Sequence, residues 1–580
     1  MNKRLLLEIC GVVGVVALAL MFRFYDIQHY PPGLFPDQAA NGEDALLILD
    51  GDWRPFYERG NGREALFFYA QALSIKYLGI GVWQMFAVSA AVGVLTVLAT
   101  YFATRPFFGR LAALLAAFFL ATSYWHVTLS RTGFRAIQIP LFVAAFTAFT
   151  GYTIQSVKKK QLTASYIYAA LAGAAFTGGF YTYIAYRVMI GVVLGVFVLL
   201  LLAAIHPKIG FPHFKRYGAH IIIAIIAGLI TFAPLGWYFI EHPDAFIGRA
   251  GQVSVFNKQL QEEFGGGTLT GTLLYSTEET LKSFFTGQGD INWRHNVAGY
   301  PLLNPLVGLM FLLGLIWTLH GTVQVALSLI RGKEVHLGMI YPYFLLVLFG
   351  MLLPVITTAE GMPHGLRSVG LIAPIFILAG TAAAVSYRWV LRWVGKGLPR
   401  SLASGVVIGL LILSAVYDGV LYFGITRNDS GAAYAYRADL TDVSNYINQY
   451  KKDHPNETRP YLVLDKFSIQ TVHFLTHTLS GNTSFPPPHD YQDHPDEAEH
   501  LYTYLNPVDS YLTPLKAGEV IIFTQSTLPD ADKYQQTYGN SLELIESRHN
   551  RWHQEIMRVY RAVKDGTPKA NQVEEFNLDA

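Results

Sequence analysis

The chain has 580 residues, of which 52% are hydrophobic and only 14% are charged, and its mean hydropathy is +0.31. A soluble globular protein carries about 25% charged residues, so much of this surface must face a medium other than water. The formal net charge of +2 lacks the strong positive excess that nucleic-acid-binding domains use. The composition therefore predicts a large membrane domain with a smaller appended domain, and no nucleic-acid partner.

The N-terminal segment MNKRLLLEICGVVGVVALALMF resembles a signal peptide, because a basic start precedes an apolar run. It lacks a small-residue cleavage site, so we favour a retained signal-anchor helix over a cleaved leader. Cys10, the single cysteine of the chain, lies inside this run. The appended domain is therefore expected to fold without disulfides.

Apolar segments that suggest membrane-spanning helices recur along the first three quarters of the chain, since about 20 apolar residues cross a bilayer core. About eleven of them begin near Leu5, Val82, Leu111, Ala136, Ala164, Val188, Ala219, Leu302, Gly338, Val369 and Leu402. Lysine and arginine concentrate in every second connecting loop, and cytoplasmic loops carry such an excess. The alternation predicts a cytoplasmic N-terminus and places the chain after Phe423 outside the cytoplasm.

Two of the predicted outer loops are long, at about residues 23–81 and 241–300, and a shorter one spans 357–368. The first contains the apolar stretch Glu64–Tyr77, which is too short to span a membrane and is expected to form an interfacial helix. Loops longer than about 15 residues are usually functional in compact folds. The functional residues are therefore expected on the outer side.

The composition changes after residue 424, where the predicted membrane domain of residues 1–424 ends. In residues 425–565, the strand-like segments PYLVLD and EVIIFTQ alternate with helix-like segments at 439–452 and 467–479. This alternation predicts a small extracytoplasmic α/β domain. A proline-rich acidic loop, FPPPHDYQDHPDEAEH, interrupts it, and residues 566–580 are expected to form a disordered tail.

Acidic residues cluster in the first outer loop, PPGLFPDQAANGEDALLILDGDW. Asp37 follows the membrane exit closely, and partial desolvation there would make its carboxylate a better general base. Asp37 could instead cap the helix expected over residues 39–49. Glu43 and Asp44 are candidates for supporting acids or for oxygen ligands of a divalent cation. No cofactor motif is evident, and a divalent cation is the one cofactor that these acids leave open.

Basic residues gather on the same outer side, although cytoplasmic loops are where they normally concentrate. They are Arg131, Arg135, Arg187, Arg294, His295, His364 and Arg367. Each lies beside a predicted helix end, where an arginine often extends to lipid headgroups, and this explains any one of them. As a set they favour phosphate binding, because arginine donates two parallel hydrogen bonds to phosphate.

The segment GGFYTYIAYR carries Tyr181 and Tyr183, which could stack on a sugar ring or belong to the aromatic belt at the membrane interface. Together with Arg187 and Glu64 they are our candidates for a sugar or acceptor pocket.

Several of these segments resemble the GT-C superfamily of membrane glycosyltransferases, in the bacterial branch akin to protein O-mannosyltransferases and lipid A aminoarabinose transferases. PDQAANGEDALLILDGDWRPFY and GREALFFYAQALSIKYLG are similar to its first loop, and SRTGFR, YTYIAYR, RHNVAGYPLLNPLVG and PHGLRSVGLIAP follow in the family's order. The resemblance covers about Leu5 to Gly424 and implies a polytopic α-helical membrane fold. Gln38 stands where relatives often have glutamate, and Gln138 stands where they often have aspartate.

The resemblance implies a polyprenyl-phosphate sugar as donor and a hydroxyl of a glycan, lipid or protein as acceptor. Asp37 would deprotonate this hydroxyl as it attacks the anomeric carbon, with inversion. The donor phosphate would be bound by Arg294, His295, His364 and Arg367, with Arg131 and Arg135.

A flippase or transporter for lipid-linked sugars is the main alternative. Transporters usually place polar residues near the bilayer midplane in broken helices, whereas the centres of these predicted spans carry few charges and the polar residues gather at the outer rim. This favours chemistry at the membrane surface. A non-catalytic membrane scaffold is a third interpretation. The sugar, the acceptor, the metal dependence and the oligomeric state stay open.

Overall fold

The structure is a computed structural model, which describes residues 3–59, 62–205, 212–247, 254–287, 289–333, 337–358, 361–394, 400–476, 501–510 and 513–566. The chain forms two compact units. The first comprises Met1–Ile27, Arg54–Phe67 and Phe86–Asn428, and the second comprises Gln28–Trp53, Phe68–Met85 and Asp429–Ala580.

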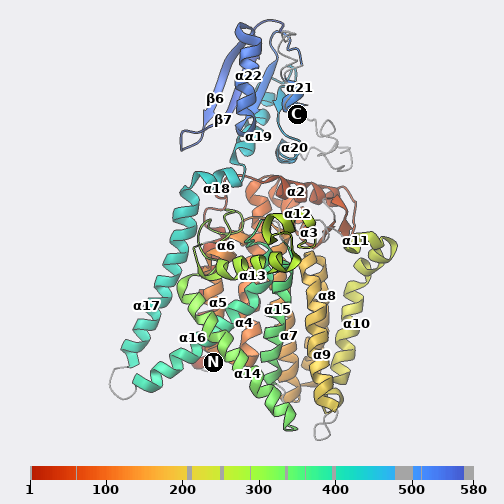
Figure 1. The fold of residues 1–580 in the computed structure, drawn as a ribbon, viewed down its shortest axis with the longest axis vertical. Coiled ribbons are helices and arrows are strands. Elements are labelled where there is room, and N and C mark those ends of the chain that lie inside the picture. The colour runs from red at the N-terminus through yellow and green to blue at the C-terminus, as the bar shows by residue number, and fades with distance from the viewer. Residues whose placement is uncertain are drawn as a thin grey trace. The chain divides into compact units, whose positions relative to one another are not determined.

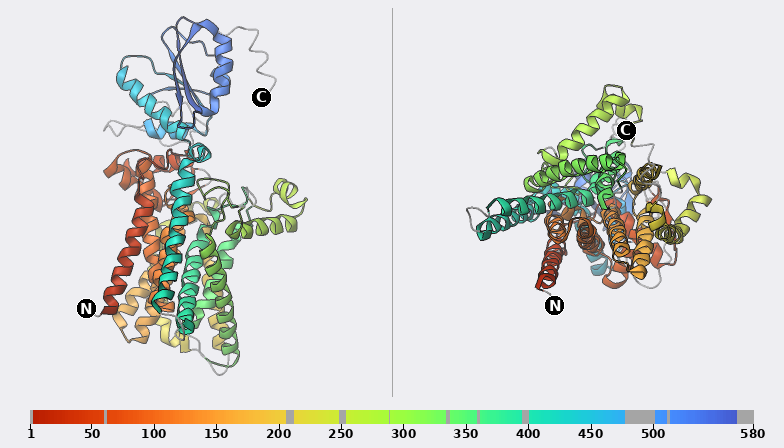
Figure 2. Two further views of the ribbon diagram at one scale, coloured as in Figure 1. Left: turned by 90° about the vertical axis from the view of Figure 1, so that its left-hand side faces the viewer. Right: turned by 90° about the horizontal axis from the view of Figure 1, so that it is seen from below.

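The first unit consists mostly of helices, and the long ones among them lie side by side (Figure 1, and Figure 2, left). They are α1 (Lys3–Phe24), α4 (Val82–Phe108), α5 (Arg110–Thr122), α6 (Tyr124–Ser130), α7 (Gln138–Lys158), α8 (Leu162–Gly178), α9 (Met189–Ile205), α10 (Pro212–Glu241), α14 (Pro305–Ile330), α15 (Ile340–Ile356), α16 (Ile372–Val394) and α17 (Arg400–Gly419). Helix α8 packs against α7 and α10, and α16 packs against α5 and α14. The apolar stretch of the α16 span is 89% buried, so α16 is a central helix of this unit.

The described residues contain eight helices that are long and apolar enough to cross a membrane, or nine if the bent pair α5 and α6 forms one span. Ile230 and Leu413 on such helices are 71% and 65% exposed, as expected of side chains that face lipid. Each of the predicted segments contains a helix. Two of these helices, α8 and α15, have 17 residues each, which is shorter than the roughly 20 residues that cross a bilayer core. The chain is thus an integral membrane protein, and the count of eleven spans remains a prediction.

Two buried arginines join the ends of helices in the first unit. Arg23 donates to the carbonyl oxygens of Leu120 and Ala121, where α5 ends and the chain bends by 62° into α6. Arg131 donates to the carbonyls of Arg23 and Tyr25, just where α1 ends. The last carbonyls of a helix have no partner within the helix, so these guanidinium groups satisfy groups that would otherwise be buried without a hydrogen bond.

The long loops of the first unit, which the sequence predicts to face outward, carry short elements. Strand β1 (Phe56–Tyr57) pairs antiparallel with β2 (Arg63–Glu64), and the second long loop contains α11 (Pro243–Ile247), α12 (Lys258–Gly265) and α13 (Leu269–Phe285). Helix α13 exposes Leu274 and Leu281, an apolar surface that suits an interfacial helix. The predicted interfacial segment 64–77 contains α3 (Leu66–Leu78).

The second unit contains a five-stranded mixed sheet in the order β4-β3-β5-β7-β6. Its strands are β3 (Tyr461–Val463), β4 (Thr503–Leu505), β5 (Val520–Thr524), β6 (Leu542–His549) and β7 (Glu555–Ala562). Strand β3 runs parallel to β4 and β5, and β7 runs antiparallel to β5 and β6. Its helices are α2 (Pro36–Leu49), α18 (Ser430–Ala435), α19 (Ala438–Asp453), α20 (Ile469–Thr476), α21 (Pro507–Ser510) and α22 (Leu528–Tyr538), with most of α3.

Successive residues of each strand point to opposite faces of the sheet, and helices cover both faces. Leu462 and Ile522 belong to a core with residues of α19 and α20. Val463 and Phe523 belong to the core that includes Tyr534 of α22. The predicted α/β domain is confirmed, and its two predicted strands are β3 and β5.

The boundaries of the second unit differ from those expected from the sequence. Residues 28–53 of the first outer loop were assigned to the membrane domain, but in the structure they fold with the C-terminal residues. The proline-rich acidic loop at 485–500 and all of the predicted tail after Gly566 lie outside the described residues.

Candidate functional site

Two loops of the first unit bring a carboxylate and two histidines together. Asp290 and His295 lie in the loop that follows α13, and His364 lies in the loop that precedes α16. An isolated antiparallel bridge between Ser254 and Thr358 also joins the segment before α12 to the segment after α15. Residues far apart in the sequence thus share one site.

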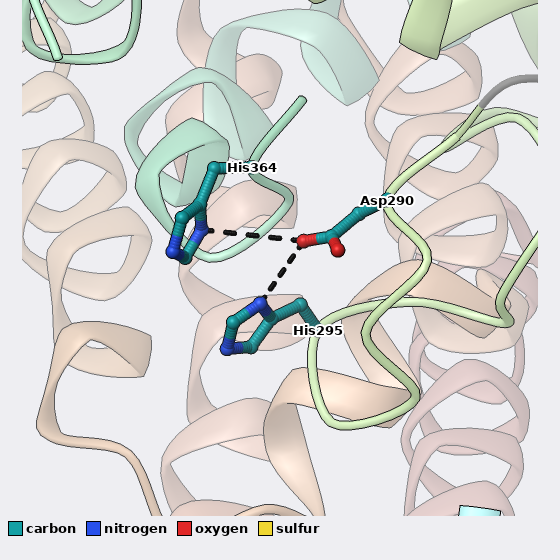
Figure 3. A group of neighbouring side chains, drawn as sticks. All are labelled: Asp290, His295 and His364. Atoms are coloured by element: carbon teal, nitrogen blue, oxygen red, sulfur yellow. Dashed lines mark hydrogen bonds and ion pairs between the residues drawn. The ribbon is translucent and has the colours of Figure 1, made fainter. Parts of the chain in front are cut away.

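Asp290 is the centre of this group (Figure 3). Its Oδ2 accepts hydrogen bonds from His295 Nδ1 at 3.0 Å and from the Gly365 N–H at 2.7 Å, and its Oδ1 accepts one from the Asn292 N–H at 2.8 Å. His364 Nδ1 lies 4.0 Å from Oδ2. The carboxylate is buried, with a side-chain exposure of 5%. Because an ionised carboxylate only accepts hydrogen bonds, His295 donates from Nδ1 when no metal is bound, and a metal bound between Asp290 and this nitrogen would replace that proton.

The two imidazole rings stack with their centroids 4.5 Å apart and an interplanar angle of 20°. Figure 3 shows that each ring turns one nitrogen toward Asp290 and the other nitrogen away from it. The nitrogens that point away lie on the same side of the pair.

Burial lowers the pKa of both histidines. For His295, the neighbouring Asp290 opposes this effect in part. For His364 the pKa falls well below its usual value, and the nearby His295, Arg367 and Arg294 add to the effect of burial. Both rings are therefore neutral at neutral pH. The positive charge near these rings is carried by Arg294 and Arg367, and a role of the two histidines in phosphate binding remains a prediction.

Aromatic side chains support the same loops. The Arg294 guanidinium lies over the Phe134 ring at 5.9 Å, and Phe134 also contacts the ring of His295. The indole N–H of the buried Trp125 donates to the Gly365 carbonyl at 3.2 Å. The helix α6 and the turn after it thus hold both loops in place from one side.

The ligand atoms of Asp290, His295 and His364 all lie within 4.8 Å of one another. Two imidazoles and one carboxylate, with a position left open, are a frequent ligand set for catalytic zinc and other transition metals. The three residues therefore form a candidate metal site, and the neutral state of the rings suits metal coordination. Within the described part of the chain, no such group includes Glu43 or Asp44.

A second cluster surrounds Glu64, which is 2% exposed. Arg135 Nε lies 3.4 Å from one carboxylate oxygen of Glu64, and Arg187 NH2 lies 3.5 Å from the other. Arg135 lies over the ring of Tyr183 at 5.2 Å, and Arg187 lies over the ring of Phe246 at 4.6 Å. The structure thus unites Glu64, Tyr183 and Arg187, which we predicted for the sugar or acceptor pocket, and adds Arg135 to them.

Two predicted residues have structural contacts instead. Arg131 is fully buried, donates to the carbonyls of Arg23 and Tyr25 where α1 ends, and lies over the rings of Tyr422 and Phe423. The Tyr181 hydroxyl donates to the Thr231 carbonyl at 2.8 Å and accepts from the Leu235 N–H at 3.1 Å. These two residues flank Pro234 in α10, so Tyr181 bridges the helix where the proline interrupts it. We leave Arg131 and Tyr181 out of the proposed site.

Asp37 lies in the first turn of α2 in the second unit. It is exposed, whereas residues 38–46 of the same helix are all buried. The N-cap residue is Phe35, and its N–H donates to Gln38 Oε1 at 2.9 Å. Gln38 rather than Asp37 therefore caps the helix, and the glutamine provides the contact that a glutamate would make there.

The other acids of the first loop are buried on α2, where Asp44 is 1% exposed and Glu43 is 3% exposed. His473 Nδ1 lies 2.8 Å from Glu43 Oε1. Asp290 and His473 were not found from the sequence. For Asp290 the one local signal was its closeness in sequence to Arg294 and His295, in GDINWRHN. For His473 the sequence contained no such signal.

No protein-family model matches the chain, and no curated protein matches its sequence. Solved structures do match, and at 12–14% identity they show a shared fold, which agrees with the fold that the resemblance to the GT-C superfamily implied. ArnT from Cupriavidus metallidurans, bound to undecaprenyl phosphate, is 14% identical with a TM-score of 0.50, over 96% of this chain and 98% of that chain. The oligosaccharyltransferase of Archaeoglobus fulgidus, in complex with Zn and sulfate, is 12% identical with a TM-score of 0.51, over 94% of this chain and 72% of that chain.

Proposed function

We propose that this protein is an inverting glycosyltransferase that moves a sugar from a polyprenyl-phosphate donor to an acceptor hydroxyl at the outer face of the membrane. The observation that carries the proposal is the buried Asp290, which contacts His295 and lies 4.0 Å from His364, with Arg294 and Arg367 nearby, in a fold shared with ArnT bound to undecaprenyl phosphate. The basic residues in alternate loops support a cytoplasmic N-terminus and an extracytoplasmic C-terminal domain.

In the proposed reaction, Asp37 accepts the proton of the acceptor hydroxyl while the hydroxyl oxygen attacks the anomeric carbon. The bond between this carbon and the phosphate oxygen breaks, and the lipid phosphate leaves with the electron pair. Its negative charge grows as it departs, and Arg294 and Arg367 stabilise that charge. Preorganised positive groups in a site shielded from water contribute about 3 kcal/mol or more to such a step. The cluster of Glu64, Arg135, Tyr183 and Arg187 is the proposed pocket for the sugar or the acceptor.

The experiment that tests this function supplies the purified protein with radiolabelled polyprenyl-phosphate sugars and a mixed acceptor extract. A new labelled product and an equal amount of released lipid phosphate are expected. Donor that stays intact with every sugar tried would contradict the proposal. The predictions below use the same assay.

A divalent cation at Asp290, His295 and His364 is part of the proposal. It is supported by the ligand set and by the Zn in the Archaeoglobus oligosaccharyltransferase structure. A cation there would supply a Lewis-acidic contact for a phosphate oxygen. The residues of this chain hold the ligands in place: Gly365 and Asn292 fix the carboxylate through their N–H groups.

We expect removal of the cation with a chelator to reduce sugar transfer at least tenfold, and Zn²⁺ or Mn²⁺ to restore it. Elemental analysis of the purified protein should find about one metal ion per chain, and His364→Ala should lose it. The matched control is His242→Ala, because His242 is an exposed histidine of the same long loop and should retain the metal. Full activity of metal-free protein would remove the cation from the proposal and leave the transferase intact.

Arg294→Gln and Arg367→Gln are each expected to raise the KM for the donor. A charge-assisted hydrogen bond contributes about 1.5–3 kcal/mol, which corresponds to roughly a 10- to 150-fold change. Lys258→Gln is the control, since Lys258 is an exposed cation on α12 and should leave the KM unchanged. An unchanged KM in both arginine variants would show that the phosphate binds elsewhere.

A further inference from the structure

Helix α2, which presents Asp37, packs against α20 within the second unit. Helix α20 lies more than 400 positions later in the sequence: the contact between Thr471 Oγ1 and the Leu34 carbonyl, at 3.0 Å, joins residues 437 positions apart. The rings of Phe35 and Phe467 meet edge to face, with their centroids 5.5 Å apart. The C-terminal chain thus contacts the segment just before α2 begins.

Helices α2 and α20 pack so closely at Gly42 that no larger side chain fits there. A Cβ on Gly42 would collide with the ring of Phe474. Both ends of this region are therefore tied to the C-terminal chain, since Gly33 fits against the backbone of Tyr436 and Ala438 in the same way. The backbone around Asp37 is held by residues that fold with the C-terminal sheet.

A buried polar pair connects the same helices. His473 on α20 and Glu43 on α2 lie 2.8 Å apart, and their side chains are only 1% and 3% exposed. Glu43 comes six positions after Asp37, so the pair fixes the rotation of α2 about its axis as well as its position. A hydrogen bond is directional, and it therefore specifies which side of the helix faces α20.

We infer that the C-terminal domain is a positioning domain for the catalytic helix α2, and that His473 is a positioning residue that acts through Glu43. This inference rests on the proposed role of Asp37 as the base. It gives Glu43, which the sequence offered as a supporting acid or metal ligand, the role of holding α2. It also explains why Asp37 is the exposed residue at the start of an otherwise buried helix: the burial of residues 38–46 sets the direction of that one side chain.

The test compares His473→Leu with His473→Gln in the full-length protein. Leucine fills much of the space but cannot hydrogen-bond to Glu43, whereas a glutamine amide can donate to it. We expect His473→Leu to lower kcat by about 10- to 100-fold, because a misplacement of about 1 Å at a reacting group can cost that much. The KM for the donor should change less than about twofold, since the arginines that bind phosphate are in the other unit. His473→Gln should recover most of the lost rate.

The controls separate positioning from folding. His454→Leu removes a histidine from the end of α19 and should retain the wild-type kcat. The fraction of folded protein is measured by thermal melt and gel filtration at the assay temperature, and all rates are expressed per folded molecule. A folded His473→Leu variant with the wild-type kcat, or a His473→Gln variant no better than His473→Leu, would overturn the inference. An inactive wild-type protein would instead refute the proposed function itself.

Discussion

Asp37→Asn is expected to abolish sugar transfer, with kcat lowered by a factor of about 10²–10⁴, the usual contribution of a general base. The amide has the size of the carboxylate but cannot take the proton from the acceptor hydroxyl. The helix should be undisturbed, because Phe35 and Gln38 make the N-terminal cap of α2 and Asp37 is exposed. The measurement is the rate of labelled product formation at saturating donor, with the thermal melt of each variant as the check on folding.

The matched control for this variant is Asp50→Asn, at the other end of the same helix. Asp50 is also exposed and has no proposed role in catalysis, so its variant should turn over at the wild-type rate. Wild-type kcat in a folded Asp37→Asn protein would exclude Asp37 as the base, and the exposed position of this carboxylate would then have no catalytic meaning.

Asp290→Asn is expected to have the second largest effect, a loss of metal affinity or activity of about 10- to 100-fold or more. Alteration of a residue that only supports metal ligands already costs about that much, and Asp290 is itself a proposed ligand. Asp290 accepts hydrogen bonds from Asn292, His295 and Gly365 through both of its oxygens. Asparagine has one acceptor atom, so at least one buried donor must face an N–H group. The unmatched donor should also lower the unfolding free energy by about 1–3 kcal/mol.

Metal content, the KM for the donor and the melting temperature are measured together for Asp290→Asn. Asp244→Asn on α11, an exposed aspartate of the same long outer loop, is the control and should match wild type in all three. Wild-type values of the metal content and of the KM in Asp290→Asn would show that the cluster in Figure 3 has only a structural role.

The membrane helices could be predicted because long apolar runs have few alternatives to a membrane span. In the α/β domain, β3 and β5 are short apolar runs that both faces of the sheet bury, and these were found. Strands β4, β6 and β7 were missed. For β6 the reason is that LELIESRH, on the sheet edge, is rich in charged residues and gives a weak strand signal.

The set of Arg294, His295, His364 and Arg367 could be predicted because the alternation of the spans puts their two loops on one side. Asp290 could not, because its importance depends on the loop after α13 meeting Gly365, 75 positions away. The structural contacts of Arg131 and Tyr181 could not be predicted for a related reason. Both lie near a helix end, and the sequence does not show whether such a side chain faces a pocket or satisfies a neighbouring helix. The His473 contact with Glu43 has the largest sequence separation of these features, 430 positions.

The most direct test of the account follows a labelled polyprenyl-phosphate sugar in vesicles that contain the purified protein. The proposed transferase should cleave the donor, release lipid phosphate and pass the label to an acceptor, and the folded Asp37→Asn variant should not. Donor that remains intact with every sugar tried, yet crosses the vesicle bilayer only when the protein is present, would contradict the account and identify a flippase.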